Sequence, residues 1–280
     1  MRTGSIIFNC KGGLMMIYFN GEKVEIKKFP NGEALMQSKT LNIKEEKNEI
    51  RVKFESDEDI THLIFLKCNL DELGVKCSLV LPYMPYSRMD RTEGITVFTL
   101  KHLCKVINNL SFDSVTIYEP HSDVTVALLD RVKVIDMSKT LAEGLLEKLN
   151  TSEKEVYLVY PDAGAAKRYG KQINYDKILT ASKERDFKTG RIKSLEINGA
   201  TNGKSFIAII VDDLCSKGGT FALTASKLKA MGASEVYLVV THCEDTIFEG
   251  ELLTTDLINE VYTTNSILSK EHEKIKIYEI

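Results

Sequence analysis

Two adjacent carboxylates and a glycine-rich turn stand together in the C-terminal half of the chain. Asp212 and Asp213 follow an apolar, β-branched run, and Ser216-Lys217-Gly218-Gly219-Thr220 comes next, at the start of an amphipathic stretch. Glycines let the backbone approach a ligand closely, and the free N–H groups at the start of a helix attract an anion. The two carboxylates repel that anion, so they must face hydroxyl groups or a cation. This order of groups is typical of a sugar-phosphate site. The alternative, a tight turn with a solvated acidic pair, is disfavoured by the apolar run before it and the Gly-Gly-Thr after it.

Short apolar runs alternate with amphipathic stretches along the chain. The alternation predicts strands over 50–54, 77–81, 115–118, 156–160, 206–211 and 236–240, and helices over 59–73, 99–110, 141–149, 165–172 and 220–231. Strands that alternate with helices form parallel sheets covered by helices on both faces, so we expect an α/β fold. Ligands of such sheets bind beyond the carboxyl ends of the strands, and the loops at those ends carry charged residues and glycines here.

The two halves of the chain repeat one order of elements. Residues 77–121 and residues 206–242 each contain a strand, a loop, a helix, a short turn and a second strand that is followed by His. The length of the chain allows two domains. We therefore expect two similar α/β domains, residues 1–138 and residues 139–280.

The loops at the predicted strand ends resemble the motifs of one enzyme family. Residues 211–220 resemble the phosphoribosyl-diphosphate loop of type I phosphoribosyltransferases, and the other loops narrow the resemblance to the ribose-phosphate diphosphokinases, or PRPP synthetases. Residues 29–33 resemble the family's adenine-contacting Phe-x-Asp-Gly-Glu loop, and residues 83–91 its ATP-binding Pro-Tyr-x-x-Tyr-Ala-Arg-Gln-Asp-Arg segment. Pro120-His121 stands at the place of the family's Asp-Leu-His, residues 161–168 match Pro-Asp-x-Gly-Gly-x-x-Arg, and residues 183–185 match the flexible-loop Lys-x-Arg.

The resemblance implies an enzyme that transfers the β,γ-diphosphoryl group of ATP to the C1 hydroxyl of ribose 5-phosphate, giving PRPP and AMP, with Mg²⁺ as its cofactor. It implies two phosphoribosyltransferase-like domains, the first for ATP and the second for the ribose phosphate. The implied catalytic residues are Lys183 and Arg185, and the implied metal-binding residues are His121 and Asp162. The implied ATP-binding residues are Phe29, Asn31, Glu33, Arg88, Asp90 and His121. The implied ribose-phosphate-binding residues are Asp212, Asp213, Ser216, Lys217, Gly218, Gly219 and Thr220.

Lys217 departs from the family pattern and leaves the acceptor open. Most members have Asp-Thr where this chain has Ser216-Lys217, and a cation beside the 5-phosphate would suit an acceptor with more phosphate. ADP-ribose, which some phage relatives diphosphorylate to rebuild NAD, is therefore an alternative acceptor.

Two further readings change the class of protein. One is a non-catalytic, nucleotide-binding regulator of a PRPP synthetase; loss of Lys183 or Arg185 would favour it, and both are present. The other is a phosphoribosyltransferase that consumes PRPP, which the duplicated domain and the adenine-type loop disfavour.

The composition excludes several classes of protein. The chain has 37 Lys and Arg against 40 Asp and Glu, a net charge of −3, whereas a dedicated nucleic-acid binder needs a basic excess. No apolar run approaches the ~18 residues of a membrane span, and the first residues do not form a secretory signal. The six cysteines are expected to be free thiols. We expect a cytoplasmic homo-oligomer built from dimers, up to a hexamer, that binds neither nucleic acid nor membrane.

Overall fold

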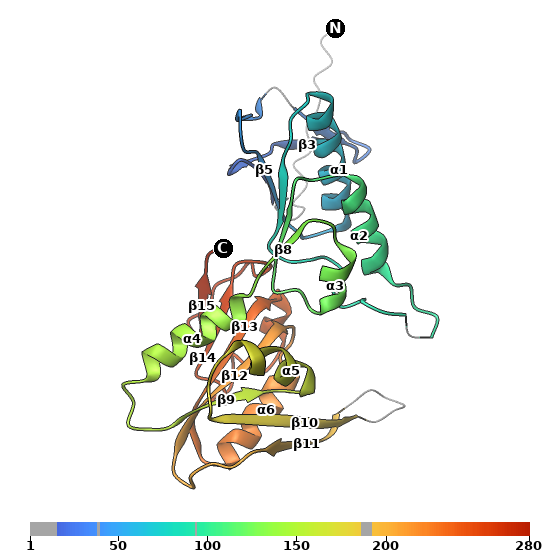
Figure 1. The fold of residues 1–280 in the computed structure, drawn as a ribbon. Helices are drawn as coiled ribbons and strands as arrows, with labels where there is room; N and C mark the ends of the chain where they lie inside the picture. Colours follow the sequence, from blue (N-terminus) through green and yellow to red (C-terminus); the bar gives the residue numbers. More distant parts are fainter. Residues whose placement is uncertain (1–15, 38–39, 93, 186–191) are drawn as a thin grey trace. The chain divides into compact units, whose positions relative to one another are not determined.

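The chain folds into two compact units, Met1–Ile135 and Asp136–Ile280 (Figure 1). The structure is a computed structural model that describes residues 16–37, 40–92, 94–185 and 192–280. The boundary predicted from the sequence, between residues 138 and 139, falls inside the first turn of helix α4 (Met137–Leu149).

The first unit is built on a mainly parallel sheet. Its order is β2-β1-β5-β6-β7-β8, with β5 to β8 parallel and β1 antiparallel to both of its neighbours. The strands are β1 (Met16–Phe19), β2 (Glu22–Lys23), β5 (Glu49–Lys53), β6 (Ser78–Leu81), β7 (Val115–Tyr118) and β8 (Val132–Ile135). The helices are α1 (Asp57–Glu72), α2 (Thr99–Asn109) and α3 (Asp123–Leu128). A separate hairpin consists of β3 (Ile26–Lys28) and β4 (Ala34–Met36).

The second unit has a larger sheet of the same kind. Its order is β11-β10-β9-β12-β13-β14-β15, and all neighbours are parallel except β10 and β11. The strands are β9 (Val156–Tyr160), β10 (Ile178–Arg185), β11 (Ile192–Asn198), β12 (Phe206–Cys215), β13 (Ala233–Cys243), β14 (Glu260–Thr264) and β15 (Ile275–Tyr278). The helices are α4, α5 (Ala163–Gln172) and α6 (Gly219–Ala230), and a 3₁₀-helix, η2 (Asp245–Glu249), follows β13.

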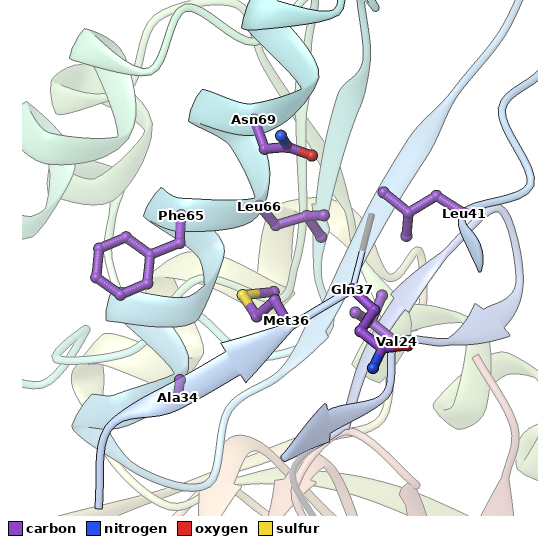
Figure 2. Close-up of a pocket in the computed structure, with 8 residues that line it drawn as sticks. All are labelled: Val24, Ala34, Met36, Gln37, Leu41, Phe65, Leu66 and Asn69. Atoms are coloured by element: carbon purple, nitrogen blue, oxygen red, sulfur yellow. The ribbon is translucent and has the colours of Figure 1, made fainter. Parts of the chain in front are cut away.

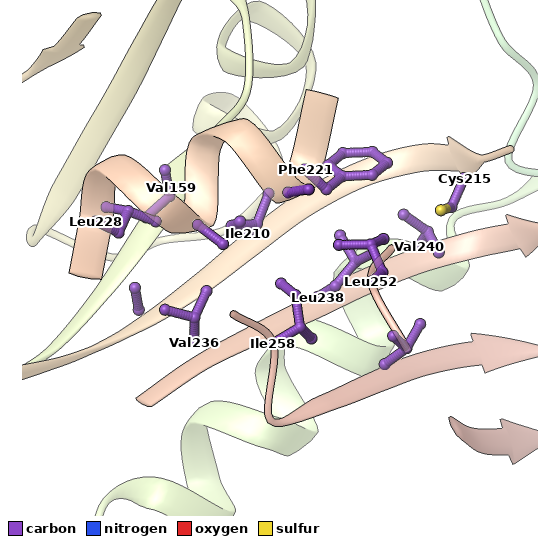
Figure 3. Close-up of a cluster of buried hydrophobic side chains, with 14 of the residues drawn as sticks. Val159, Ile210, Cys215, Phe221, Leu228, Val236, Leu238, Val240, Leu252 and Ile258 are labelled. Atoms are coloured by element: carbon purple, nitrogen blue, oxygen red, sulfur yellow. The ribbon is translucent and has the colours of Figure 1, made fainter. Parts of the chain in front are cut away.

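The side chains of strand β12 show that this sheet is covered on both faces. Successive side chains of a strand point to opposite faces. Phe206, Ala208 and Ile210 pack in one buried cluster with α6. Figure 3 shows Ile210 beside Phe221 and Leu228 of that helix. Residues 207, 209 and 211 pack in a second cluster with α4 and α5. Burial on both sides is why the run is apolar throughout rather than alternating.

The expected fold class is confirmed, and two local predictions are corrected. Asp212 and Asp213 do not lie in a loop after the strand: β12 runs to Cys215, with Asp212 in register with Val240 of β13. Residues 183–185 do not lie in a loop either, because they are the last residues of β10, where Lys183 pairs with Leu195 of β11. In both places a neighbouring strand supplies backbone hydrogen bonds that extend the strand past its apolar run.

Candidate functional site

The acidic pair lies at the carboxyl end of β12, at the centre of the larger sheet. Asp213 is buried, with 7% of its surface exposed, and its amide donates a hydrogen bond to Oδ1 of Asp212 (3.0 Å). Burial raises the pKa of the Asp212 carboxyl well above its usual value, and the nearby carboxylates of Asp213 and Asp162 raise it further. The Asp212 carboxyl therefore holds its proton more tightly than an isolated aspartate and can donate a hydrogen bond to a sugar hydroxyl.

The glycine-rich turn joins β12 to α6 and is fixed by two close contacts. Gly218 caps α6 in the left-handed conformation (φ +80°), and a Cβ there would lie 2.1 Å from Leu252 Cδ1. A Cβ on Gly250 would lie 1.9 Å from the carbonyl oxygen of Lys217. Nothing lies within 4 Å of the place where a Cβ of Gly219 would stand. The turn is thus held from behind by residues after η2, while its front at Gly219 is open beside the first amides of α6.

The side chain of Lys217 is paired at the surface, which argues against a role in binding an additional phosphate of the acceptor. Its ammonium group lies 2.7 Å from Oε2 of Glu249, and both side chains are more than half exposed. The hydrogen bond from Lys217 lowers the pKa of the Glu249 carboxyl. Within the described residues, the extra positive charge that favoured a more phosphorylated acceptor is therefore already balanced. Ser216, directly before Lys217, and Thr220, in the first turn of α6, are half-buried.

Asp162 and Lys183 form the second part of the site in this unit. Asp162 caps α5, accepting a hydrogen bond from the amide of Ala165 (3.0 Å), and Lys183 Nζ lies 3.2 Å from its Oδ2. Burial acts to raise the pKa of the Asp162 carboxyl, but the Ala165 amide and the Lys183 charge outweigh it, and the pKa lies below its usual value. Asp162 is therefore an ionised carboxylate whose field also reaches Asp212. The Arg185 side chain lies outside the described residues.

Of the predicted ATP-binding residues, His121 lies near Asp90. The carboxylate of Asp90, 4% exposed, accepts hydrogen bonds from Arg91 Nε (2.8 Å) and Nη2 (3.3 Å). The hydrogen bond from Arg91 lowers the pKa of Asp90, and Ser122 and His121 lower it further, which places these residues together. Arg88 is exposed on the same segment.

Two features of this unit were not found by sequence reasoning. Ser122 lies close enough to Asp90 to lower the pKa of its carboxyl although it stands in no motif, and its position directly after His121 was the only available signal. Tyr86 adopts a left-handed backbone (φ +59°), which is costly for a residue with a side chain, and its hydroxyl donates to Asp57 at the start of α1. The contact to Asp57 raises the pKa of Tyr86 and holds the segment before Arg88 in place.

The adenine-type loop is the turn of the β3–β4 hairpin. Phe29 N donates to the carbonyl of Glu33 (2.8 Å), Gly32 N donates to the carbonyl of Phe29 (2.8 Å), and Asn31 Oδ1 accepts from Glu33 N (3.2 Å). The Phe29 ring is 49% exposed. A rigid loop that presents an exposed aromatic ring can stack on a base.

The nearby cavity of the first unit contains none of the predicted residues. It measures about 210 Å³ and lies between the hairpin and α1 (Figure 2). Its lining is mostly apolar and consists of Val24, Ala34, Met36, Gln37, Leu41, Phe65, Leu66 and Asn69. The chemistry of the chain is therefore assigned to the strand ends and not to this cavity.

The donor set near Asp162 fits a magnesium ion held mainly by a substrate. Mg²⁺ prefers oxygen ligands and is bound by one or two carboxylates together with substrate phosphates and water. Asp162 supplies an ionised carboxylate, and His121, the other predicted ligand, lies in the first unit. Within the described parts of the chain, no group of three or more His, Cys, Asp or Glu side chains is arranged to hold a metal unaided.

Comparison with known proteins gives the family. Residues 175–280 match the model of the phosphoribosyl synthetase-associated domain. A ribose-phosphate pyrophosphokinase from Pyrococcus abyssi is 31% identical over 264 residues, which cover 91% of this chain and 87% of the relative. The chain belongs to the ribose-phosphate pyrophosphokinase family. A member from Sulfurisphaera tokodaii is 29% identical, over 92% of this chain and 89% of its own length.

A solved structure of the same family supports the fold. Phosphoribosylpyrophosphate synthetase from Mycobacterium smegmatis matches with a TM-score of 0.74 at 18% identity, covering 91% of this chain and 85% of the other. The expected family and the two-domain α/β fold are thus confirmed.

Proposed function

We propose that this chain transfers the β,γ-diphosphoryl group of ATP to the C1 hydroxyl of ribose 5-phosphate. The observation that carries the proposal is the pairing of Asp212-Asp213 with the open glycine turn at the start of α6, in a chain 31% identical to a ribose-phosphate pyrophosphokinase. The C1 oxygen attacks the β-phosphorus, the bond from that phosphorus to the α,β-bridging oxygen breaks, and AMP leaves with that oxygen. The hydroxyl proton passes to solvent.

The ribose-phosphate side of the reaction is assigned to the second unit. Asp212 and Asp213 would hydrogen-bond the ribose hydroxyls, and the amides of residues 218–220 with the Thr220 hydroxyl would hold the 5-phosphate. The open space at Gly219 supports this assignment because a phosphate needs close approach to the backbone. Ser216 would complete the turn, and Lys217 would remain at its rim with Glu249.

Catalysis is assigned to Lys183 and Arg185. Diphosphoryl transfer requires positioning and neutralisation of negative charge more than covalent help from the protein. The Lys183 ammonium group stands beside Asp162, where a diphosphate bound at the strand ends would meet it. Asp162 and His121 would hold Mg²⁺, which when bound neutralises phosphate charge.

The nucleotide side is assigned to the first unit. Arg88 and Asp90 would contact ATP together with His121, and Phe29 would stack on adenine while Asn31 and Glu33 shape the loop. The exposed ring of Phe29 supports a homo-oligomer in which this loop reaches a neighbouring subunit's ATP. Dimers, and a hexamer built from them, are the assemblies that we propose.

A cytoplasmic location is also proposed. The described cysteines are free thiols, as in proteins of a reducing compartment. In the described residues, helices of the length and hydrophobicity that a membrane crossing needs are absent.

The decisive experiment incubates the protein with ATP and Mg²⁺ in three arms: ribose 5-phosphate, ADP-ribose and no acceptor. Mass spectrometry then identifies AMP and the diphosphorylated product. Formation of PRPP and AMP in the first arm alone supports the proposal. Formation of a diphosphorylated product only in the second arm would show that the acceptor is ADP-ribose and not ribose 5-phosphate. If no arm releases AMP, the alternative of a non-catalytic, nucleotide-binding regulator would be favoured. The paired state of Lys217 favours ribose 5-phosphate.

A further inference from the structure

Hydroxyl side chains are buried together beneath the acidic pair, at the carboxyl ends of β13 and β14 and the start of α4. These residues are Ser138, Thr241, Thr263, Thr264 and Ser266, each with 0% of its surface exposed, and His242 beside them is 2% exposed. Burying a hydroxyl without a partner is costly, so a cluster of them requires that each be hydrogen-bonded.

The cluster is tied directly to the backbone of Asp212. Ser138 Oγ donates to the Asp212 carbonyl (2.9 Å) and lies 2.8 Å from Thr241 Oγ1. A hydroxyl has one proton and a carbonyl can only accept, so Thr241 donates to Ser138. The result is a directed chain from Thr241 through Ser138 to Asp212, which joins β13, α4 and β12.

Thr241 is itself held by the next strand. Its carbonyl accepts hydrogen bonds from the hydroxyls of Thr264 (2.7 Å) and Thr263 (3.3 Å). Ser266 Oγ lies 2.9 Å from Nδ1 of His242 and 3.4 Å from the same carbonyl. The position of the Asp212 carbonyl is therefore set by side chains from three separate parts of the unit.

Directional bonds of this kind specify one backbone geometry where apolar packing would allow several. Asp212 is the point at which β12 begins to carry the acidic pair, so its backbone decides where both carboxylates point. We propose that Ser138 and Thr241 are positioning residues that align Asp212 and Asp213 with the ribose hydroxyls. This inference rests on the proposed function.

A hydrogen bond at the other end of β12 offers a control. Ser234 Oγ donates to the carbonyl of Phe206 (3.1 Å), the first residue of β12. Ser138→Ala and Ser234→Ala each remove a hydroxyl that donates to a carbonyl of β12, at opposite ends of the strand, and only the end that Ser138 contacts carries the acidic pair. Ser234→Ala also removes the hydrogen bond that Ser234 Oγ accepts from Lys154 Nζ (3.0 Å).

Steady-state kinetics of the full chain test the proposal. Ser138→Ala raises the KM for ribose 5-phosphate about ten-fold, the scale of one lost hydrogen bond, and changes the KM for ATP less than about two-fold. Thr241→Val, which keeps the side-chain shape, shifts the KM for ribose 5-phosphate in the same direction, and Thr241→Ser restores it. Equal changes in both KM values, or the same effect from Ser234→Ala, would overturn the proposal. If Ser138→Ala does not fold, the Thr241 pair decides.

A binding measurement separates this inference from the proposed function. Calorimetry with ribose 5-phosphate alone needs no turnover; Ser138→Ala weakens binding about ten-fold and Ser234→Ala leaves it unchanged. No AMP release by the wild type overturns the proposed function. Unchanged affinity of Ser138→Ala overturns the positioning role even in an active enzyme, and a wild type that does not bind ribose 5-phosphate overturns both.

Discussion

Lys183 Nζ lies 3.2 Å from Asp162 Oδ2, and the register of two parallel strands brings them together. The last paired residues of β9 and β10 are Tyr160 and Thr180. Asp162 follows the first of these and caps α5, while Lys183 follows the second on a strand that continues beside β11. A cation and a carboxylate thus meet just past the carboxyl end of the sheet, where ligands of parallel sheets bind.

Replacing Lys183 with Met should abolish turnover while sparing nucleotide binding. Loss of one preorganised charge opposite a transferred phosphoryl group lowers kcat by roughly 100-fold or more. We expect AMP release to fall by at least this factor, with ATP affinity, measured by calorimetry, little changed. Lys177→Met is the control, because Lys177 forms an ion pair with Glu155 (2.8 Å) that is shorter than that of Lys183 and lies before the other end of β10. Comparable turnover in the two variants would contradict the role of Lys183.

Asp212→Asn should stabilise the protein as it inactivates it. Because burial raises the pKa of Asp212, the folded state binds more protons than the unfolded state between the unfolded pKa of about 3.9 and the raised pKa of the folded state. Wild-type stability therefore falls as pH rises through this window, and Asp212→Asn escapes the loss. The stabilisation of Asp212→Asn relative to wild type reaches its full size at and above the folded pKa.

Calorimetric melting temperatures between pH 4 and pH 8 check this expectation. The difference between Asp212→Asn and wild type should be small at the acid end and grow with pH. Asp256→Asn changes an exposed carboxylate of the same unit and should give no such trend. A difference that shrinks as pH rises would show that the sign is wrong.

Local patterns were sufficient for the strands whose limits are set by their own burial. β9 consists of five buried residues, Val156–Tyr160, and its bounds are those that the apolar run predicts. The extension of β12 to Cys215 was not predictable in the same way, since it depends on pairing with β13, for example Leu214 with His242. Lys183 is in a strand for the same reason, through its pairing with β11.

Sequence alone could single out candidate site residues where they stand in a recognisable stretch. The acidic pair and the glycine turn stand in one such stretch, so they could be named as candidates. Ser138 could not, because its partners Asp212 and Thr241 are 74 and 103 residues away, and a single serine near the start of a helix gives no signal. The pairing of Lys217 with Glu249 was likewise not visible in the sequence.

Gly250→Ala should displace the ribose-phosphate turn. The new Cβ would lie 1.9 Å from the Lys217 carbonyl oxygen, so the backbone must move. We expect a loss of about 1–3 kcal/mol in the free energy of unfolding and a raised KM for ribose 5-phosphate. Gly144→Ala, in the middle of α4 with nothing within 4 Å of the new Cβ, should instead gain about 0.5–1 kcal/mol. Urea unfolding and steady-state kinetics measure both, and normal kinetics for Gly250→Ala would argue against a fixed turn.

Lys217→Ala should have little effect on the reaction with ribose 5-phosphate. Its charge is balanced by Glu249 at the surface, and an exposed ion pair of this kind contributes little to stability. We therefore expect the KM for ribose 5-phosphate to change less than about three-fold and the melting temperature to stay nearly constant. Glu249→Ala frees the ammonium group, so if Lys217 can reach a bound phosphate, this variant should tighten phosphate binding, most at low ionic strength. A large rise in KM for Lys217→Ala would mean that the lysine leaves Glu249 to bind the acceptor, and ADP-ribose would then regain its place as a substrate to be tested.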